Sequence, residues 1–195
     1  MALHKCSMAK FVVHILLYLY AVAAIGQSAT VQNGTFRSVF DFQTQTPSQV
    51  SWTVRASDLG ELTREPSWKF RRDVNDPRAK VRHSDYARSG YDRGHLCPAA
   101  DRSLSRDSMR ATFALSNCCP QAPALNRGAW LQSEIDCRKA AIMYDSVRVL
   151  ALAIQLDDDT LFIGRHRVAV PDAFVKVAWL PAKDSIIGQW FFFNR

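Results

Sequence analysis

The sequence predicts an α+β fold built on a central, mainly antiparallel β-sheet. Three observations support this class. Short runs in which apolar and polar residues alternate begin at Val50. Residues 124–144 contain no proline and few β-branched residues, which is typical of one long helix. From Val147 onward the chain returns to strand-like runs separated by polar turns. With 195 residues, of which 48% are hydrophobic, the chain can bury one core, and we expect one folded domain.

The first 26 residues predict export. Lys5 and Lys10 precede an apolar run from Phe11 to Ile25 that closes on small residues, which is the layout of a secretory signal peptide. An uncleaved membrane anchor is the alternative, but a run of about 15 residues is shorter than the ~20 that span a bilayer. We therefore expect residues 1–26 to be removed, leaving a secreted or periplasmic protein without stable membrane association.

Residues 27–49 are rich in Thr, Ser and Gln, and we expect them to form a loosely held polar leader. The catalytic domain is then expected to span residues 50–195. Its first strands are predicted at 50–54 and 67–70, and Asn75-Asp76-Pro77 indicates a turn after them.

A short helix is expected at 105–113, where Met109 and Phe113 are one turn apart and Ser105 or Asp107 can cap the first turn. Residues 114–118 then indicate a short buried strand. After the long helix at 124–144, five further strands are predicted at 147–156, 160–163, 168–170, 174–180 and 186–193.

Positive charge is concentrated in the middle of the chain. Removing residues 1–26 with their two Lys lowers the formal net charge from +7 to +5. Between Arg64 and Arg110 there are twelve Lys or Arg and seven Asp or Glu, so the whole excess lies in this stretch. A basic zone suits a polyanionic substrate such as nucleic acid, and a solvated surface that keeps the protein soluble is the plainer alternative.

Four cysteines remain after the signal segment, namely Cys97, Cys118, Cys119 and Cys137. An even number in an exported protein predicts disulfides, with three pairings open. Zinc is the alternative, but no Cys-x-x-Cys pair occurs. Because a bridge between adjacent cysteines would be strained, we expect Cys118 or Cys119 to pair with Cys97 or Cys137.

The most informative stretch is Tyr91-Asp92-Arg93-Gly94-His95-Leu96. Hydrolysis of a phosphodiester needs a base for the attacking water and positive charge for the phosphate. His95 is the best candidate base, since only histidine titrates near neutrality without a perturbed environment. If the segment is extended, Arg93 and His95 project from the same face, which places a guanidinium group beside the imidazole. For an isolated histidine a structural role would be the plainer interpretation.

The long helix candidate carries Asn126, Trp130 and Glu134 at intervals of four residues. On a continuous helix Asn126 and Glu134 share one broad face but lie about 12 Å apart along the axis. They are therefore predicted to hold Mg²⁺ unequally, with Asn126 as a direct ligand and Glu134 acting through a metal-bound water. Trp130 is better explained by core packing than by base stacking.

Taken together, these motifs resemble those of the DNA/RNA non-specific endonuclease family, whose active site is built on a ββα-metal finger. The resemblance rests on Asp92-Arg93-Gly94-His95, Ser116-Asn117-Cys-Cys-Pro120-Gln121, Leu125-Asn126-Arg-Gly128-Ala-Trp130 with Glu134, and the segment 168–176. It implies that a ββα-metal finger carries the active site beside the sheet.

The same resemblance implies roles for individual residues. His95 would be the general base, Asn126 the one direct protein ligand of the metal, and Glu134 an outer residue that positions metal-bound water. Arg93 and Arg64 would contact the phosphate, and Asn117 would support the site by hydrogen bonds. Mg²⁺ is the expected cofactor, with Mn²⁺ or another divalent cation as the alternative.

Two departures from the family pattern stand out. Residues 150–159 lack the glycine-containing turn that family members usually carry after the central strand. Family chains also usually continue past the strand at 186–193, whereas this sequence stops at Arg195, so a C-terminally truncated domain is the basis of one alternative below.

We therefore expect a secreted metal-dependent endonuclease that cleaves DNA and RNA with little sequence preference. One alternative is an exported nucleic-acid-binding protein that has lost catalysis through truncation. Another is an enzyme that acts on other phosphodiesters. The sequence leaves open the oligomeric state, a homodimer included.

Overall fold

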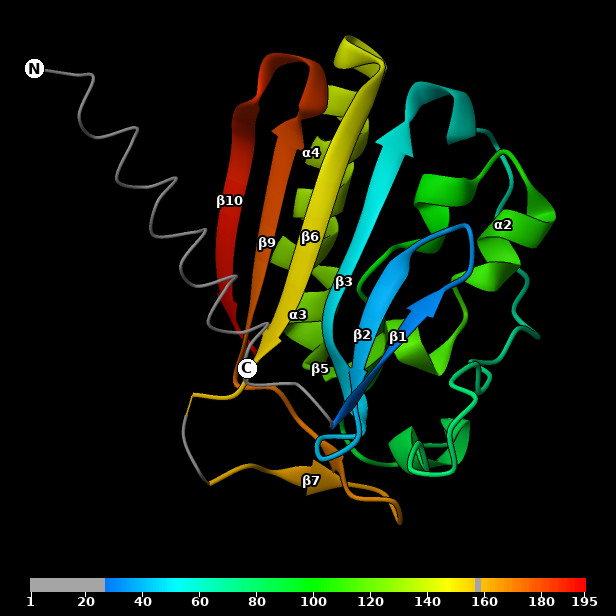
Figure 1. Ribbon diagram of the computed structural model, residues 1–195, viewed down its shortest axis with the longest axis vertical. Helices are drawn as coiled ribbons and strands as arrows, with labels where there is room; N and C mark the ends of the chain where they lie inside the picture. The colour runs from blue at the N-terminus through cyan, green and yellow to red at the C-terminus, as the bar shows by residue number, and fades with distance from the viewer. Residues whose placement is uncertain (1–26, 157–158) are drawn as a thin grey trace, which may run out of the picture.

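A six-stranded antiparallel sheet forms the centre of the molecule in the computed structural model, which describes residues 27–156 and 159–195 (Figure 1). The strand order is β1-β2-β3-β6-β9-β10, and every neighbouring pair is antiparallel. The strands are β1 (Ser28–Gln32), β2 (Arg37–Asp41), β3 (Thr46–Arg55), β6 (Ser146–Ile154), β9 (Ala173–Leu180) and β10 (Ser185–Phe193). The predicted fold class is confirmed.

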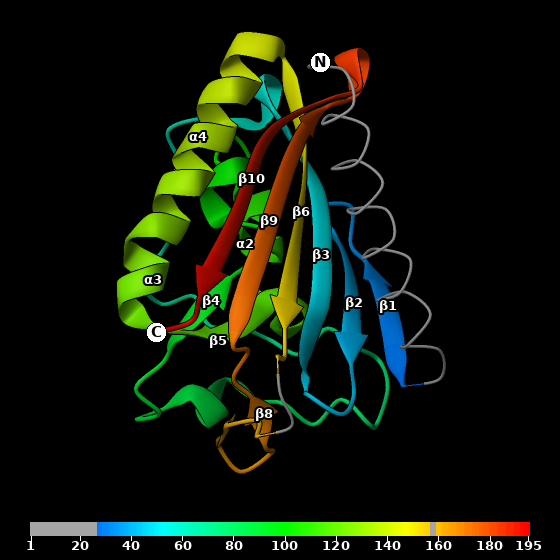
Figure 2. The ribbon, with the colours of Figure 1, turned by 90° about the vertical axis from the view of Figure 1, so that its left-hand side faces the viewer.

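The helices α3 and α4 run along one face of this sheet (Figure 2). The α-helices are α2 (Arg106–Ala111), α3 (Pro123–Arg127) and α4 (Ala129–Tyr144). Two small antiparallel pairs complete the structure, β4 (Asp92–His95) with β5 (Cys118–Gln121) and β7 (Phe162–Ile163) with β8 (Val168–Ala169). Short 3-10 turns are η1 (Ala56–Asp58), η2 (His83–Tyr86), η3 (Ala99–Arg102), η4 (Leu115–Asn117) and η5 (Pro181–Lys183).

The alternating pattern of β3 determines which face of the sheet is buried. Val50, Trp52 and Val54 point to the core that the helices cover, and their neighbours face outward. Each fully buried valine contributes about 1.5–3 kcal/mol relative to an exposed one. The alternation therefore sets both the register of the strand and the side on which α4 packs.

The segment expected to be a loosely held leader is part of the sheet. Residues 27–49 contain β1, β2 and the start of β3. Phe36, Ser38 and Phe40 are buried, and the Ser38 hydroxyl donates a 2.6 Å hydrogen bond to the Ser116 carbonyl. Because a polar residue lies between the two phenylalanines on the buried face, the sequence pattern concealed the strand. The signal peptide expected at residues 1–26 lies outside the described residues.

The long helix predicted at 124–144 is two helices. The chain breaks at Gly128, which has φ −110° and ψ −109°. A Cβ at this position would lie 2.5 Å from the Ala124 carbonyl oxygen, so the break depends on glycine. Asn126 consequently lies on α3 while Glu134 lies on α4, and the argument from one continuous helix face does not apply.

Other local predictions had mixed outcomes. Ser105 caps α2, since its hydroxyl accepts a hydrogen bond from the Ser108 amide. Residues 67–70 form no strand, although Arg71 makes an isolated bridge to Ala114. Residues 114–118 are buried as predicted, but they form a 3-10 turn that leads into β5.

The predicted disulfides do not form. Cys97, Cys118, Cys119 and Cys137 are all free and buried. Cys118 and Cys119 are consecutive on a strand and therefore point to opposite sides, each into a different hydrophobic cluster. Burial raises the pKa of the Cys118 thiol to about 12, as expected for cysteines that act as small apolar residues. Within the described ranges, no helix is long and apolar enough to cross a membrane.

Candidate active site

The pair β4–β5 brings the candidate residues to one place beside the sheet. Arg93 is paired with Pro120, and His95 is paired with Cys118. The segment 92–95 is extended, as the sequence predicted, so Arg93 and His95 project from the same side of β4.

The ring of His95 packs against two phenylalanine rings, which also contact each other at 5.3 Å between centroids. Its centroid is 4.5 Å from that of Phe70 and 4.7 Å from that of Phe113. Burial and, to a smaller extent, the positive charge of Arg64 lower the pKa of His95 to about 3. His95 is therefore neutral at pH 7, and its Nε2 atom has no hydrogen-bond partner among the described residues. That nitrogen is enclosed by protein atoms, and the neutral imidazole is the form of the ring that can accept a proton.

Arg93 and Arg64 are the two arginines that the sequence predicted for this site. Arg93 donates from Nε and Nη2 to the His83 carbonyl oxygen at 3.2 and 3.0 Å, which anchors its guanidinium group on η2. Its Nη1 group takes no part in those bonds. Arg64 is exposed, and its charge lowers the pKa of both His95 and Asp92. The charge of Arg64 thus reaches β4, the strand that carries Arg93 and His95.

Asp92 fixes the orientation of Asn126. The Asn126 amide nitrogen donates to Asp92 at 2.9 Å, and Arg127 donates to the same carboxylate at 2.9 and 2.7 Å. The hydrogen bonds from Arg127, and then from Asn126, lower the pKa of Asp92. Because the amide nitrogen is held in this way, the carbonyl oxygen of Asn126 points elsewhere and makes no hydrogen bond to the described residues. An oriented, half-exposed amide oxygen suits a hard divalent cation.

Glu134 lies deeper, in a cluster of buried charges. Burial raises the pKa of its carboxyl to about 7, and the nearby Lys176 charge acts in the opposite direction. Arg138 lies 4.0 Å from Glu134 and 2.9 Å from Asp101. A cation nearby would favour the ionised carboxylate, so Glu134 fits the outer role that the family resemblance implies.

Two members of this cluster were missed in the sequence. Arg138 is four residues after Glu134 on α4, a spacing that could have identified it. Lys176 is fully buried on β9, where its ammonium group donates to Ser133 at 2.8 Å and lies 3.6 Å from the Trp130 ring centroid. Residues two apart on a strand share a face, so the position of Lys176 two residues after Phe174 could have indicated that it faces the core. Trp130 packs in the core as expected, and its indole N–H donates to the His95 carbonyl at 3.2 Å.

Asn117 is fully buried and does not face the site. Its amide oxygen accepts from the Cys97 amide at 2.8 Å, and its amide nitrogen donates to the carbonyls of Cys97 and Thr112 at 2.8 and 2.9 Å. It therefore joins the end of β4 to the start of β5. This arrangement makes Asn117 a positioning residue for His95.

Across the described part of the chain, no three His, Cys, Asp or Glu side chains form a group that could hold a metal ion. The expected ligand is the amide oxygen of Asn126, which is not one of those donor types.

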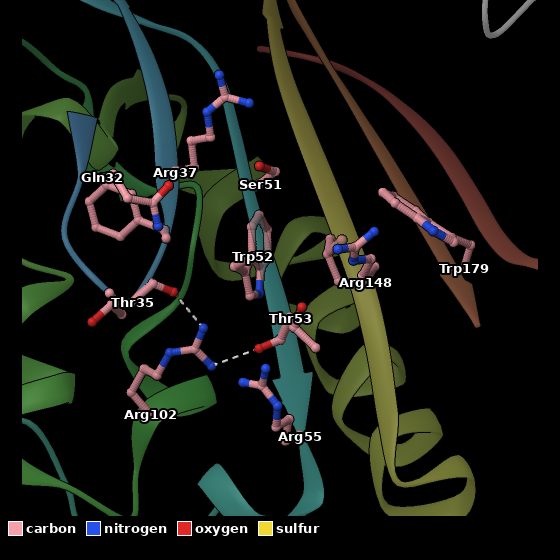
Figure 3. Close-up of a pocket in the computed structure, with 13 residues that line it drawn as sticks. Gln32, Thr35, Arg37, Ser51, Trp52, Thr53, Arg55, Arg102, Arg148 and Trp179 are labelled. Atoms are coloured by element: carbon pink, nitrogen blue, oxygen red, sulfur yellow. Dashed lines mark hydrogen bonds between the residues drawn. The ribbon is translucent and has the colours of Figure 1, made fainter. Parts of the chain in front are cut away.

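A separate hollow of about 400 Å³ lies on the outer face of the sheet (Figure 3). Arg37, Arg55 and Arg148 line it, and Arg102 beneath them donates to the carbonyls of Thr35 and Thr53. None of the predicted site residues contributes to its lining.

Comparisons with known proteins agree with the motifs. The model of the DNA/RNA non-specific endonuclease family matches residues 18–191. Nuclease 1, mitochondrial, of Schizosaccharomyces pombe is 37% identical over an alignment of 158 residues. The alignment covers 74% of this chain and 49% of that protein. The mitochondrial nuclease of Saccharomyces cerevisiae is 36% identical over 159 residues, 73% of this chain and 47% of that protein. The chain thus spans about half the length of these relatives.

A solved structure gives the same result for the fold. The EndoG chain in the crystal structure of the EndoG/EndoGI complex superposes with a TM-score of 0.76 and 27% identity, covering 85% of this chain and 74% of that one. Human mitochondrial endonuclease G is 38% identical over 117 residues, 55% of this chain and 39% of that protein.

The relatives contradict the predicted secreted or periplasmic localisation. Those from both yeasts, zebrafish and human are named as mitochondrial nucleases. The prediction was wrong because an apolar run preceded by lysines does not by itself distinguish export from import into an organelle.

Proposed function

Because the chain belongs to the DNA/RNA non-specific endonuclease family, we propose that it is a mitochondrial endonuclease that hydrolyses phosphodiester bonds in DNA and RNA. The observation that carries the proposal is His95, a neutral imidazole that the charge of Arg64 reaches and that projects from the same side of β4 as Arg93. Phosphate contacts carry no base information, so such a site fits cleavage with little sequence preference.

His95 acts as the general base. Its free ring nitrogen accepts a proton from water while the water oxygen forms a bond to phosphorus. The bond from phosphorus to the 3′ oxygen breaks, and that oxygen leaves with the electron pair and takes up a proton. The family resemblance implies this direction of cleavage, which leaves 5′-phosphate and 3′-hydroxyl ends.

Arg93 and Arg64 hold the phosphate and stabilise the charge that develops on its oxygens. Asn117 and Trp130 act only indirectly, since they fix the backbone on either side of His95 by hydrogen bonds. Arg93 is itself braced by the His83 carbonyl, so its position is set before substrate binds.

Asn126 would hold a divalent cation through its amide oxygen, and Glu134 would position water bound to that cation. Mg²⁺ is the proposed ion, with Mn²⁺ as the alternative, and it would supply positive charge at the phosphate and the leaving oxygen. Asp92 supports this role because it orients the Asn126 amide. The oligomeric state stays open, and a homodimer is compatible with the proposal.

The mitochondrial location rests on the relatives and on composition. Residues 1–27, which precede the sheet, contain Lys5 and Lys10 and no acidic residue. A cationic segment without acids is typical of a mitochondrial targeting sequence. Imaging of the full chain with a C-terminal fluorescent tag tests this, and a signal confined to the secretory pathway would contradict it.

The function is tested with purified protein, plasmid DNA and RNA, in Mg²⁺ and in EDTA. We expect cleavage of both nucleic acids in Mg²⁺ only, and loss of at least about 100-fold in rate for His95→Ala, with nucleic-acid affinity preserved. The matched control is His166→Asn, which keeps a donor toward its buried partner Asp85 and should cleave normally. Binding of nucleic acid without hydrolysis in Mg²⁺ would overturn the proposal.

A further inference from the structure

A basic pocket lies next to the candidate active site and is not used by the mechanism above. It has a volume of about 390 Å³ and lies between the segment 65–71 and α2. Its lining residues are Glu65, Ser67, Trp68, Lys69, Arg71, Arg106, Arg110 and Phe113.

The pocket shares a wall with the site. Phe113 lines the pocket, and the same ring lies 4.7 Å from the ring of His95. Trp68 packs edge-on against Phe113 at 5.4 Å. Phe113 therefore borders both the pocket and the candidate base, so the two are neighbours on the protein.

The cations of the pocket come from two elements that present them in a regular way. Lys69 and Arg71 are exposed, Trp68 is half-buried and lines the pocket beside them, and Phe70 is buried. Arg106 and Arg110 are four residues apart and share one face of α2. Two rows of positive charge thus face the same hollow.

These charges are largely unneutralised. Glu65 is the one acidic residue in the lining, and it forms an ion pair with Arg106. In the described ranges, no carboxylate lies within ion-pair distance of Lys69, Arg71 or Arg110. Three free cations around an aromatic wall make a site suited to phosphates joined to flat, apolar groups.

The positive charge is continuous with that of the active site. Lys69 and Arg93 both act on His83, whose pKa is lowered first by burial and then by these two charges. Arg64, whose charge reaches His95, directly precedes Glu65 of the pocket. Positively charged side chains therefore lie both near the candidate base and in the pocket.

We propose that this pocket holds the nucleic-acid strand beside the bond to be cleaved, with Lys69, Arg71 and Arg110 contacting the neighbouring phosphates. The proposal rests on the proposed nuclease function, since it assigns a second contact site to the same substrate. Trp68 supplies an apolar wall for a base or sugar of the bound strand.

Binding is measured without cleavage, in EDTA, by fluorescence anisotropy of a labelled single strand of about 20 nucleotides. The double variant Lys69→Ala/Arg110→Ala is expected to bind about tenfold more weakly than the unmodified protein at physiological salt. The slope of log affinity against log salt concentration should fall by about 1.4, since each lost phosphate contact on a single strand is worth about 0.7.

The matched control removes two arginines from the hollow on the outer face of the sheet. Arg37→Ala/Arg148→Ala loses the same charge from a pocket without predicted site residues (Figure 3). Its affinity should stay within about twofold, because general attraction changes little with two remote charges. Equal weakening by both double variants, or unchanged affinity in Lys69→Ala/Arg110→Ala, would overturn the proposal.

A variant that should bind the strand more tightly gives a test that does not depend on a loss of binding. Glu65→Gln removes the acid that pairs with Arg106, and the strand should then bind about threefold more tightly. Unchanged or weaker binding would count against the pocket.

Cleavage assays separate this inference from the proposed function. If the unmodified protein binds the strand with the expected salt slope but does not cleave in Mg²⁺, the pocket stands and the nuclease function fails. If it cleaves while Lys69→Ala/Arg110→Ala keeps an unchanged KM for the strand, the nuclease function stands and the pocket fails. The expected result is a raised KM with kcat preserved at saturating strand.

Discussion

One added methyl group at position 94 should disable the site, because another side chain already fills the space. A Cβ on Gly94 would lie 1.9 Å from Oε1 and 2.7 Å from Cγ of Gln121. Gln121 is fully buried, so its side chain cannot swing into solvent to make room. Overpacking of this kind costs about 1–3 kcal/mol, and we expect Gly94→Ala to lower the free energy of unfolding by about 2 kcal/mol.

The same change should have a larger effect on activity than on stability. Gly94 lies between Arg93 and His95, so any relief of the contact moves at least one of them. A displacement of about 1 Å at a reacting group costs on the order of 100-fold in rate. Plasmid cleavage should fall by about that factor in protein that is still folded.

A second substitution should reverse both effects. Gln121→Ala removes the atoms that the new methyl group would meet. Its own effect is small, since the one lost methylene group costs about 0.8 kcal/mol while removal of a buried amide without protein partners returns about 1–3 kcal/mol. The double variant Gly94→Ala/Gln121→Ala should therefore unfold within about 1 kcal/mol of the unmodified protein, a coupling of about 2 kcal/mol.

Urea unfolding of the four proteins measures this coupling, and plasmid cleavage in Mg²⁺ measures the recovery of activity. Two results would refute the reasoning. One is a Gly94→Ala variant as stable as the unmodified protein. The other is strict additivity of the two single changes, because the contact with Gln121 would then not be the cause.

Two further predictions concern His95 and Asn117. The ring of His95 should stay neutral down to about pH 4 in an NMR titration of the metal-free protein, and a pKa near 6.5 would contradict its packing against Phe70 and Phe113. Because the folded-state pKa lies below the unfolded one, the unfolded chain binds more protons, and this histidine should lower stability as the pH falls from about 6.5 towards 3. Asn117→Ala removes three buried hydrogen bonds and should cost about 2–4 kcal/mol in urea unfolding, whereas Gln132→Ala on the exposed face of α4 should cost less than about 0.5 kcal/mol. A cost for Asn117→Ala no larger than that of the control would contradict its role in joining β4 to β5.

The sequence predicted those parts of the fold in which burial and polarity agree. The strands after Val147 were placed within a few residues. In β6 and β9 most of the apolar side chains are buried, whereas β10 is an edge strand whose apolar residues are half-buried or exposed. The pair β1–β2 was missed because Ser38 takes a core position and satisfies its hydroxyl on the Ser116 carbonyl, far away in the sequence. A partner supplied by tertiary structure leaves no local pattern.

The candidate site also contains residues that the sequence could place and residues that it could not. Arg93 and His95 share a strand, so period-two spacing was enough to place them together. The relation between Asn126 and Glu134 depended on Gly128 continuing the helix, and glycine is the residue whose backbone conformation a sequence constrains least. Lys176 was missed because a lysine is expected at the surface, whereas here Ser133 and the Trp130 ring stabilise its charge in the core.

The contacts of His95 with two hydrophobic clusters explain how the fold keeps this candidate base uncharged. Its ring packs on Phe70 and Phe113, which belong to the cluster that also contains Cys118. Its backbone carbonyl is held by Trp130, which belongs to the cluster beneath α4. The first cluster keeps the imidazole neutral by burying it. The second cluster holds the His95 backbone in place through the hydrogen bond from Trp130. Each cluster has one of these two functions. A substitution that weakens the packing of either cluster should therefore reduce activity before it unfolds the sheet.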